Sequence, residues 1–186
     1  MSKEQERKIK TCRESRVVQT HRVFPYDLNQ HKTLFGGKLM SLIDDTASIS
    51  ATRHSRGVCV TASTDSLDFL HPIHEDHSVC VETYVTGVGK SSIEVFAKVI
   101  GEVLLTGERY LAATSFMTFV ALPTEESPTI IVPLIEPQTI EERMVCDGYD
   151  QRRKKRVSIR QFNEEFAETV TLAVPWMTKG WSEFTD

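Results

Sequence analysis

Hydrophobic and small residues recur at intervals of three and four positions between residues 36 and 56. The residues on this stripe are Leu39, Leu42, Ile43, Ala47, Ser50 and Ala51. This spacing places them on one face of a helix. Gly57 follows the stripe and is typical of a helix end. The pattern therefore predicts one long amphipathic helix over residues 36–56.

The pattern changes after this helix, where residues 58–122 contain runs of strand length that are rich in β-branched residues. The runs are VCVTASTDSLDFL, SVCVETYVTGVG, SSIEVFAKVIGEVLL and RYLAATSFMTFVAL. Turn residues separate them at His71-Pro72, Gly87–Gly89 and Thr106-Gly107. With a further strand over 15–24, the short connections favour antiparallel pairing. We expect an α+β fold in which a curved antiparallel sheet wraps around the single long helix.

Polar and proline-rich segments flank this unit. The start of the chain is polar and predicts a frayed segment, and the four prolines between 123 and 137 argue against a regular element there. From Thr139 onward the chain is expected to be mostly helical with a break near Gly148, and its last stretch, VPWMTKGWSEF, has no assignable structure. The expected organisation is a polar segment 1–14, a domain over 15–137 and a C-terminal helical extension over 138–186.

Composition and charge indicate which kinds of partner the chain is suited to bind. The chain has 186 residues, of which 40% are hydrophobic, enough for one domain with an appendage. A net charge of −4 and a pI near 5.9 give no global attraction to nucleic acid or to an anionic membrane. No apolar run approaches the length of a membrane span, and MSKEQERKIK has no signal-peptide character. We therefore expect a cytoplasmic protein without a nucleic-acid or membrane partner.

The four cysteines are Cys12, Cys59, Cys80 and Cys146, and none forms a C-x-x-C pair. In a reducing compartment they are expected to be free thiols. Cys59 and Cys80 fall in predicted strands and are expected in the core. A cysteine nucleophile is disfavoured because no basic partner lies near any of them in sequence.

The segment from Asn29 to Asp44, NQHKTLFGGKLMSLID, carries the strongest chemical signal. Gly36 and Gly37 open the predicted helix, whose free backbone N–H groups and positive dipole end suit a carbonyl oxygen that gains charge. Asp44 places a carboxylate inside an otherwise apolar helix, where it can act as a base or a nucleophile. We interpret this segment as half of a hydrolase site.

The chain resembles the bacterial and animal cytosolic acyl-CoA thioester hydrolases with the hotdog fold. The resemblance covers about residues 15–137. The matching features are the Asn29 loop, Leu34-Phe35-Gly36-Gly37, Leu39-Met40, Ile43-Asp44, Val60-Thr61-Ala62, Asp68-Phe69, Pro72-Ile73, Val88-Gly89-Lys90-Ser91-Ser92 and the strand over Phe116–Ala121. The order and spacing of these pieces together, rather than any single piece, make the signal specific. The resemblance implies a hotdog fold, an acyl-CoA substrate and no cofactor, since CoA is part of the substrate and product.

The resemblance also implies that Asn29, Asp44 and Thr61 are the catalytic residues. Asp44 serves as general base or as nucleophile, and both roles stay open. The Thr61 hydroxyl is suited to hold the water or the carboxylate, and Asn29 to bind the water or the thioester oxygen. The oxyanion donor is expected to be the backbone N–H of Gly37. Asp45 is turned by about 100° from its neighbour on the helix and is expected to be solvated.

Helix geometry adds a constraint on this site. Gly37 and Asp44 lie seven residues apart, or about 10 Å at 1.5 Å per residue, too far for both to reach one thioester carbon. We therefore expect the donors of one chain to work with the carboxylate of another across a two-fold interface, so that a lone monomer is inactive. The resemblance implies a trimer of dimers, a homohexamer.

A second set of residues is expected to bind CoA. Gly89, Lys90, Ser91 and Ser92 form a turn with backbone donors, hydroxyls and a cation that suit phosphate, and by resemblance this loop approaches the nucleotide part of CoA. Gly36 is also expected to bind CoA. A plain hairpin turn is the alternative. The turn is not a Walker A loop, because Tyr84 stands where that motif needs glycine and a strand follows.

Two other clusters carry weaker signals. His71, His74 and His77 invite a metal interpretation, but their spacing matches no standard zinc site, so a solvated hairpin loop is favoured and no metal is expected. The basic run over 152–156, with Arg160, is interpreted as a solvated helix face. A contact with the 3′-phosphate of CoA and nucleic-acid binding are the alternatives, and the acidic whole argues against the latter.

Two other functions compete with hydrolysis. A hotdog hydratase or dehydratase on acyl thioesters would depend on a histidine paired with a carboxylate, and would need His31 to be essential. A non-catalytic acyl-CoA-binding regulator would bind without turnover and would not need Asp44. The combination of Asn29, Asp44 and Thr61 favours the hydrolase.

Overall fold

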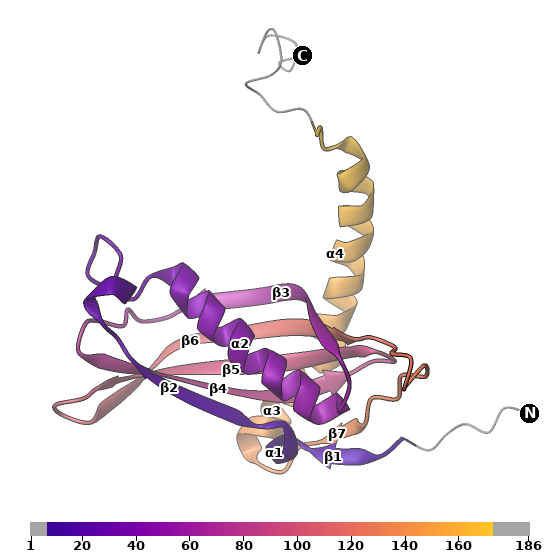
Figure 1. Cartoon of the computed structure of the whole chain (residues 1–186), viewed down its shortest axis with the longest axis horizontal. Helices are drawn as coiled ribbons and strands as arrows, with labels where there is room; N and C mark the ends of the chain where they lie inside the picture. The colour runs from indigo at the N-terminus through magenta and orange to yellow at the C-terminus, as the bar shows by residue number, and fades with distance from the viewer. Residues whose placement is uncertain (1–6, 173–186) are drawn as a thin grey trace, which may run out of the picture. The chain divides into compact units, whose positions relative to one another are not determined.

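The computed structural model describes residues 7–172 of the chain. The long helix α2 (Gly36–Ser55) lies across one face of a five-stranded antiparallel sheet (Figure 1). The strands are β2 (Val17–Arg22), β3 (Cys59–Phe69), β4 (His77–Val88), β5 (Ser92–Val103) and β6 (Glu108–Ala121). Their order across the sheet is β2-β4-β5-β6-β3. The predicted helix, strands and antiparallel pairing are therefore confirmed.

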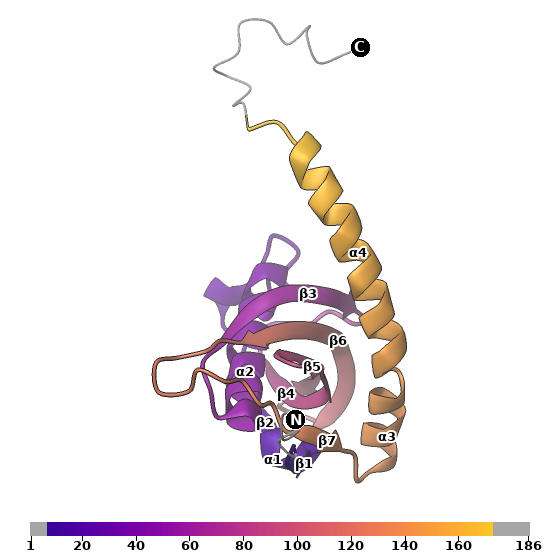
Figure 2. The same cartoon turned by 90° about the vertical axis from the view of Figure 1, so that its right-hand side faces the viewer.

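The sheet curves around α2, as Figure 2 shows along the strands. Every residue of the predicted hydrophobic stripe of α2 is buried. The stripe packs against the inward faces of the strands, where Val81, Val95 and Phe119 are fully buried. Burial of this one stripe against a curved sheet is the hotdog arrangement and confirms the expected fold class. Because the stripe is buried, only the remaining face of α2, which carries Asp44, can contact a ligand.

The expectation of a frayed start is wrong from Ile9 onward. β1 (Ile9–Thr11) pairs in parallel with β7 (Leu134–Glu136), and α1 (Cys12–Ser15) follows. The expectation that the proline-rich stretch lacks regular structure is therefore also wrong at β7. The three residues of β7 lie between Pro133 and Pro137 and can still pair, because only the residues inside the strand supply N–H groups to its partner.

The chain divides into two compact units, residues 1–149 and 150–186. Helix α3 (Ile140–Asp147) is capped by Thr139, whose hydroxyl accepts the Glu142 N–H. Gly148 ends it and α4 (Tyr149–Thr169) begins, which confirms the predicted helices and their break. The VPWMTKGWSEF stretch lies outside the described residues.

Two further expectations concern single residues and segments. Cys59 and Cys80 lie in strands and are partly buried; Cys59 packs against the core, whereas Cys80 does not, so the expected core position is wrong for Cys80. The loop between β3 and β4 that carries the histidines is not a hairpin, because these two strands are not neighbours in the sheet. Among residues 7–172, no helix is long and apolar enough to cross a membrane.

Candidate active site

Asp44 and Thr61 meet at the surface of the domain. The Thr61 hydroxyl on β3 donates a hydrogen bond to Oδ1 of Asp44 on α2, at 2.8 Å. Asp44 is partly buried, whereas Asp45 is exposed, as the turn of the helix predicts. The hydrogen bond orients one carboxylate oxygen and leaves the other available to water or substrate.

A cavity of about 290 Å³ lies beside this pair. It is lined by Met40, Ser41, Ile43, Asp44, Thr61, Thr64, Leu67, Ser115 and Met117. The wall combines apolar side chains with one carboxylate and several hydroxyls. Such a wall suits an acyl chain whose reactive end meets the carboxylate.

Asn29 lines a different cavity, of about 410 Å³, together with Gly36 and the segment from Phe69 to Ile73. The Asn29 amide Nδ2 donates to the Thr33 hydroxyl at 2.9 Å, and its Oδ1 accepts the backbone N–H of His31 at 2.8 Å. The Asn29 side chain therefore stabilises the loop over residues 29–33 by bonding to two of its members. An amide nitrogen carries two hydrogens, and the second has no acceptor among residues 7–172.

Strand register separates the two cavities within one chain. Thr61 is paired with Phe119 near one end of β3, and Phe69 with Ala113 near the other. Because β3 has two register shifts between these pairs, the same span covers only six steps of β6, or roughly 20 Å of strand. Neither cavity shares a lining residue with the other. The structure thus brings Asp44 to Thr61 and Asn29 to Gly36, but does not bring these two pairs together in one chain.

The start of α2 presents free backbone donors. Phe35 is the N-terminal cap residue and forms no side-chain cap hydrogen bond, and the first helical N–H to reach back is that of Leu39, to Phe35 O at 3.1 Å. The N–H groups of Gly36 and Gly37 precede it and have no helical acceptor. A Cβ at Gly37 would lie 2.6 Å from the Phe35 ring, so glycine keeps this ring close to the helix start.

The turn over 89–92 is the hairpin between β4 and β5, so a strand follows it, as expected. Gly89 N–H donates to Ser92 O at 2.8 Å, and Lys90 is exposed at the tip. Arg7 donates to Gly89 O at 2.9 Å and adds a second cation here. Sequence reasoning missed Arg7, because a lone arginine in a polar first segment carries no distinguishing signal.

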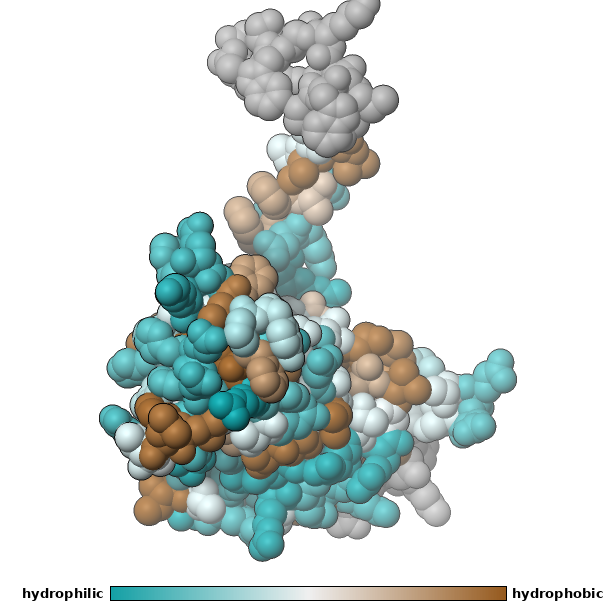
Figure 3. Space-filling view, turned by 60° about the vertical axis from the view of Figure 1, so that its left-hand side comes forward, coloured by the Kyte–Doolittle hydropathy of each residue, from teal (hydrophilic) through white to brown (hydrophobic). Residues whose placement is uncertain are grey.

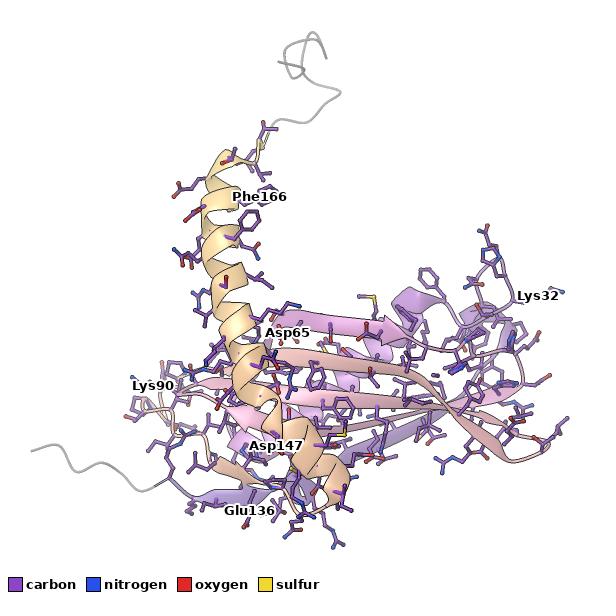
Figure 4. The ribbon with its side chains drawn as sticks, turned by 180° about the vertical axis from the view of Figure 1, so that it is seen from behind. Lys32, Asp65, Lys90, Glu136, Asp147 and Phe166 are labelled. Carbon is purple, nitrogen blue, oxygen red and sulfur yellow. The ribbon has the colours of Figure 1, made fainter. Side chains whose placement is uncertain are left out.

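Figure 4 shows Lys90 and Lys32 at opposite ends of the sheet. Lys32 belongs to the loop that Asn29 closes, since its N–H donates to Asn29 O. The register agrees, because Ile93, next to Ser92, is paired with Phe119, the partner of Thr61. The Lys90 turn therefore lies at the Asp44–Thr61 end of the domain, away from Asn29.

The remaining candidates lie apart from these groups. Among the described residues, no cluster of three histidine, cysteine, aspartate or glutamate side chains could hold a metal ion. His71 and His77 bind the Leu111 carbonyl and the Tyr110 hydroxyl, each at 2.8 Å. The basic run lies on α4 in the second unit, where Arg160 pairs with Glu164.

A third cavity, of about 970 Å³, lies at the other end of α2 and contains none of Asn29, Asp44 and Thr61. It is lined by some of the residues between Ser48 and Val58, not including His54, and by residues between Ala121 and Val132. Its size exceeds that of the two smaller cavities, but none of the candidate catalytic residues lines it.

A curved sheet around one helix, with a carboxylate on that helix and glycines at its start, defines a hotdog hydrolase. Residues 31–105 match the family model of the Thioesterase superfamily. The chain is 56% identical over 165 residues to YkhA of Bacillus subtilis (strain 168), named an uncharacterized acyl-CoA thioester hydrolase, with 89% of this chain and 95% of YkhA covered. The chain therefore belongs to the acyl-CoA thioester hydrolase family.

Solved structures agree. An acyl-CoA hydrolase from Bacillus cereus is 46% identical, with a TM-score of 0.83 over 89% of this chain and 99% of that chain. The acyl-CoA hydrolase from Staphylococcus aureus in complex with butyryl coenzyme A, coenzyme A and coenzyme A disulfide is 36% identical, with a TM-score of 0.81 over 87% and 98% of the two chains. This chain spans only 33% of the human cytosolic acyl coenzyme A thioester hydrolase, to which it is 32% identical over 125 residues.

Proposed function

We propose that this protein hydrolyses acyl-CoA thioesters to a free acid and CoA. The observation that carries the proposal is the hydrogen bond from Thr61 to Asp44 beside an apolar cavity, in a chain whose relatives are named acyl-CoA hydrolases. The S. aureus enzyme has been crystallised as alanine variants at an aspartate, a threonine and an asparagine. Each lies one position earlier in that chain's numbering than Asp44, Thr61 and Asn29 here.

Hydrolysis requires a water oxygen to attack the thioester carbon and its proton to leave. Asp44 accepts that proton as general base, or attacks first to give a mixed anhydride that water then opens. Thr61 holds the carboxylate in place. The thioester oxygen becomes an oxyanion, which the Gly37 N–H stabilises, and the CoA thiolate leaves and is protonated. Water is the only co-reactant, and the proposed mechanism uses no cofactor.

Each site is completed by a second copy of the chain. β3 is an edge strand of the sheet. Antiparallel pairing of two β3 edges about a two-fold axis brings the Thr61 end of one strand to the Phe69 end of the other. Asp44 and Thr61 of one copy would then face the partner's Asn29 and Gly37, which restores the site that one chain divides.

Exposed apolar side chains support this interface. Phe35 is 56% exposed, Met40 48% and Phe69 57%, and they lie at the start of α2 and the end of β3. Figure 3 shows hydrophobic surface among hydrophilic residues on this side of the domain. A hexameric acyl-CoA thioesterase that is 37% identical, with a TM-score of 0.77, supports a trimer of such dimers.

We also propose that the turn over 89–92 binds CoA. In one chain this turn lies at the Asp44–Thr61 end, with Lys90 exposed and Arg7 beside it. Lys90 and Arg7 suit the phosphates of CoA, and Ser91 and Ser92 add hydroxyl groups. The relatives named cytosolic support a cytoplasmic location.

The test is thiol release from a panel of acyl-CoAs of short to long chain, with Asp44→Asn and the matched control Asp45→Asn. We expect wild-type turnover, a loss of about 10²- to 10⁴-fold in Asp44→Asn, and near-wild-type rates in the control. Tight binding without turnover would overturn the proposal in favour of a regulator. A hydratase would instead need His31, which is exposed and lines neither cavity of the candidate site.

A further inference from the structure

Cys12 and Cys146 form a thiol pair away from the candidate active site. Their Sγ atoms lie 3.8 Å apart although the residues are 134 positions apart in sequence. Cys12, on α1, is 0% exposed, and Cys146, on α3, is partly buried. Both belong to the first compact unit, so their proximity is a property of one folded body.

The pair sits in a small apolar cluster of its own. Tyr84 and Phe96 are buried with Cys12, and Phe116 and Val145 pack beside them. This cluster is separate from the core between α2 and the sheet. A change at the two sulfur atoms would therefore leave the packing of α2 against the sheet intact.

Polar contacts hold both short helices against β4. The Ser15 hydroxyl in α1 accepts the backbone N–H of Val85 at 3.0 Å. Arg16, directly after α1, pairs with Glu142 of α3 and with Glu82 of β4. These contacts keep the two sulfur atoms adjacent, so a covalent bond between them needs only a short approach, from 3.8 Å to about 2.05 Å.

We propose that Cys12 and Cys146 form a reversible intramolecular disulfide by exchange with a low-molecular-weight disulfide. In the first step the Cys146 thiolate attacks one sulfur of that disulfide, forms a mixed disulfide and releases one thiolate, which takes up the proton that Cys146 lost. In the second step Cys12 loses its proton, attacks the Cys146 sulfur and releases the second thiol. Two protein thiols are oxidised and one external disulfide is reduced to two thiols.

The order of these steps follows from burial. Cys12 is closed off from solvent, so an external disulfide reaches Cys146 first. The hydrogen bond with Cys146 and burial raise the pKa of the Cys12 thiol, which stays protonated until its neighbour has reacted. Cys12 is therefore the resolving thiol. The proposal is independent of thioester hydrolysis, and its test does not use that activity.

The test treats the full-length reduced protein with oxidised glutathione, alkylates the remaining thiols and measures intact mass and peptides. For the wild type we expect two alkylated thiols out of the four cysteines, a peptide that joins residues 12 and 146, and full reversal by dithiothreitol. Cys12→Ser should accumulate the glutathione adduct on Cys146, whereas Cys146→Ser should leave Cys12 unmodified. Cys80→Ser is the matched control and should still form the bond.

The wild-type measurement decides the proposal even if a variant folds poorly. Four alkylated thiols after oxidation, a stable glutathione adduct as the end product, or a bond between chains would each overturn it. A second readout is thermal unfolding of the oxidised against the reduced wild type. Because the bond closes a loop of more than 100 residues in the unfolded chain, we expect the Tm to rise by about 10–20 °C. No rise would contradict an intramolecular bond between sulfur atoms that the fold already holds adjacent.

Discussion

The Thr61 hydroxyl donates to the Asp44 carboxylate at 2.8 Å, whereas Asn29 lies in a separate cavity with Gly36. In the proposed site, each end of β3 in one chain therefore carries only part of the catalytic set. The proposed two-fold pairing of β3 edges joins these parts. Its consequences are open to direct measurement in mixed oligomers.

Co-expression of two inactive variants should restore activity. A dimer of one Asp44→Ala chain and one Asn29→Ala chain has one site that lacks both groups and one site that is intact. With random pairing of the two chains, about a quarter of all sites are intact. We therefore expect thiol release at about a quarter of the wild-type rate from the co-expressed pair, measured on purified mixed protein. The same variants expressed alone serve as controls. Activity no higher than theirs would contradict a shared site.

Replacing Thr61 tests whether its hydroxyl orients the base. Thr61→Val keeps the shape but removes the hydrogen bond to Asp44. A hydrogen bond to a charged group is worth about 1.5–3 kcal/mol, so we expect kcat to fall about 10- to 100-fold. Thr61→Ser keeps the hydroxyl and should stay within about threefold of wild type. Equal rates in the two variants, measured by thiol release, would show that the hydroxyl has no such role.

Stability should fall on mild acidification because of His54. This side chain is 0% exposed, its Nε2 lies 2.9 Å from Pro133 O, and its Nδ1 has no hydrogen-bond partner among the described residues. Burial lowers the pKa of His54 from the ordinary value of 6.5. The unfolded chain therefore binds more protons just below that pH, and the free energy of unfolding decreases as pH falls through it.

Urea denaturation at pH 7.5 and at pH 5.5 measures this effect. His54→Gln should lose most of the difference between the two pH values. His31→Gln changes an exposed histidine and should retain it, as a matched control. A wild-type protein equally stable at both values would contradict a buried neutral His54.

A side chain at Gly87 should destabilise the packing of Tyr149. A Cβ at Gly87 would lie 2.0 Å from a carbon of the Tyr149 ring, so the ring must move. We expect Gly87→Ala to lower the free energy of unfolding by about 1–3 kcal/mol, as for other overpacked sites. Gly57→Ala is the control, because nothing lies within 4 Å of its added Cβ. Equal stability of the two variants in urea denaturation would contradict this packing.

Local pattern determined most of the secondary structure. The residues that must face the core recur at the helical period in α2 and form β-branched runs in the strands. Both patterns can be recognised from short stretches of sequence. The break at Gly148 and the exposure of Asp45 next to the partly buried Asp44 were likewise predictable from local sequence and helix geometry. The short elements β1 and β7 escaped sequence analysis, because a strand of three residues has no period to detect and prolines flank β7 on both sides.

The sequence by itself determined the hotdog class, the helix that carries Asp44 and the separation of Gly37 from Asp44 along it. Tertiary structure alone decided the order β2-β4-β5-β6-β3, the contact between Asp44 and Thr61, and the meeting of Cys12 with Cys146. The physical reason is that periodicity reports only which face of an element is buried. Which distant element covers that face depends on how the whole sheet curves around α2.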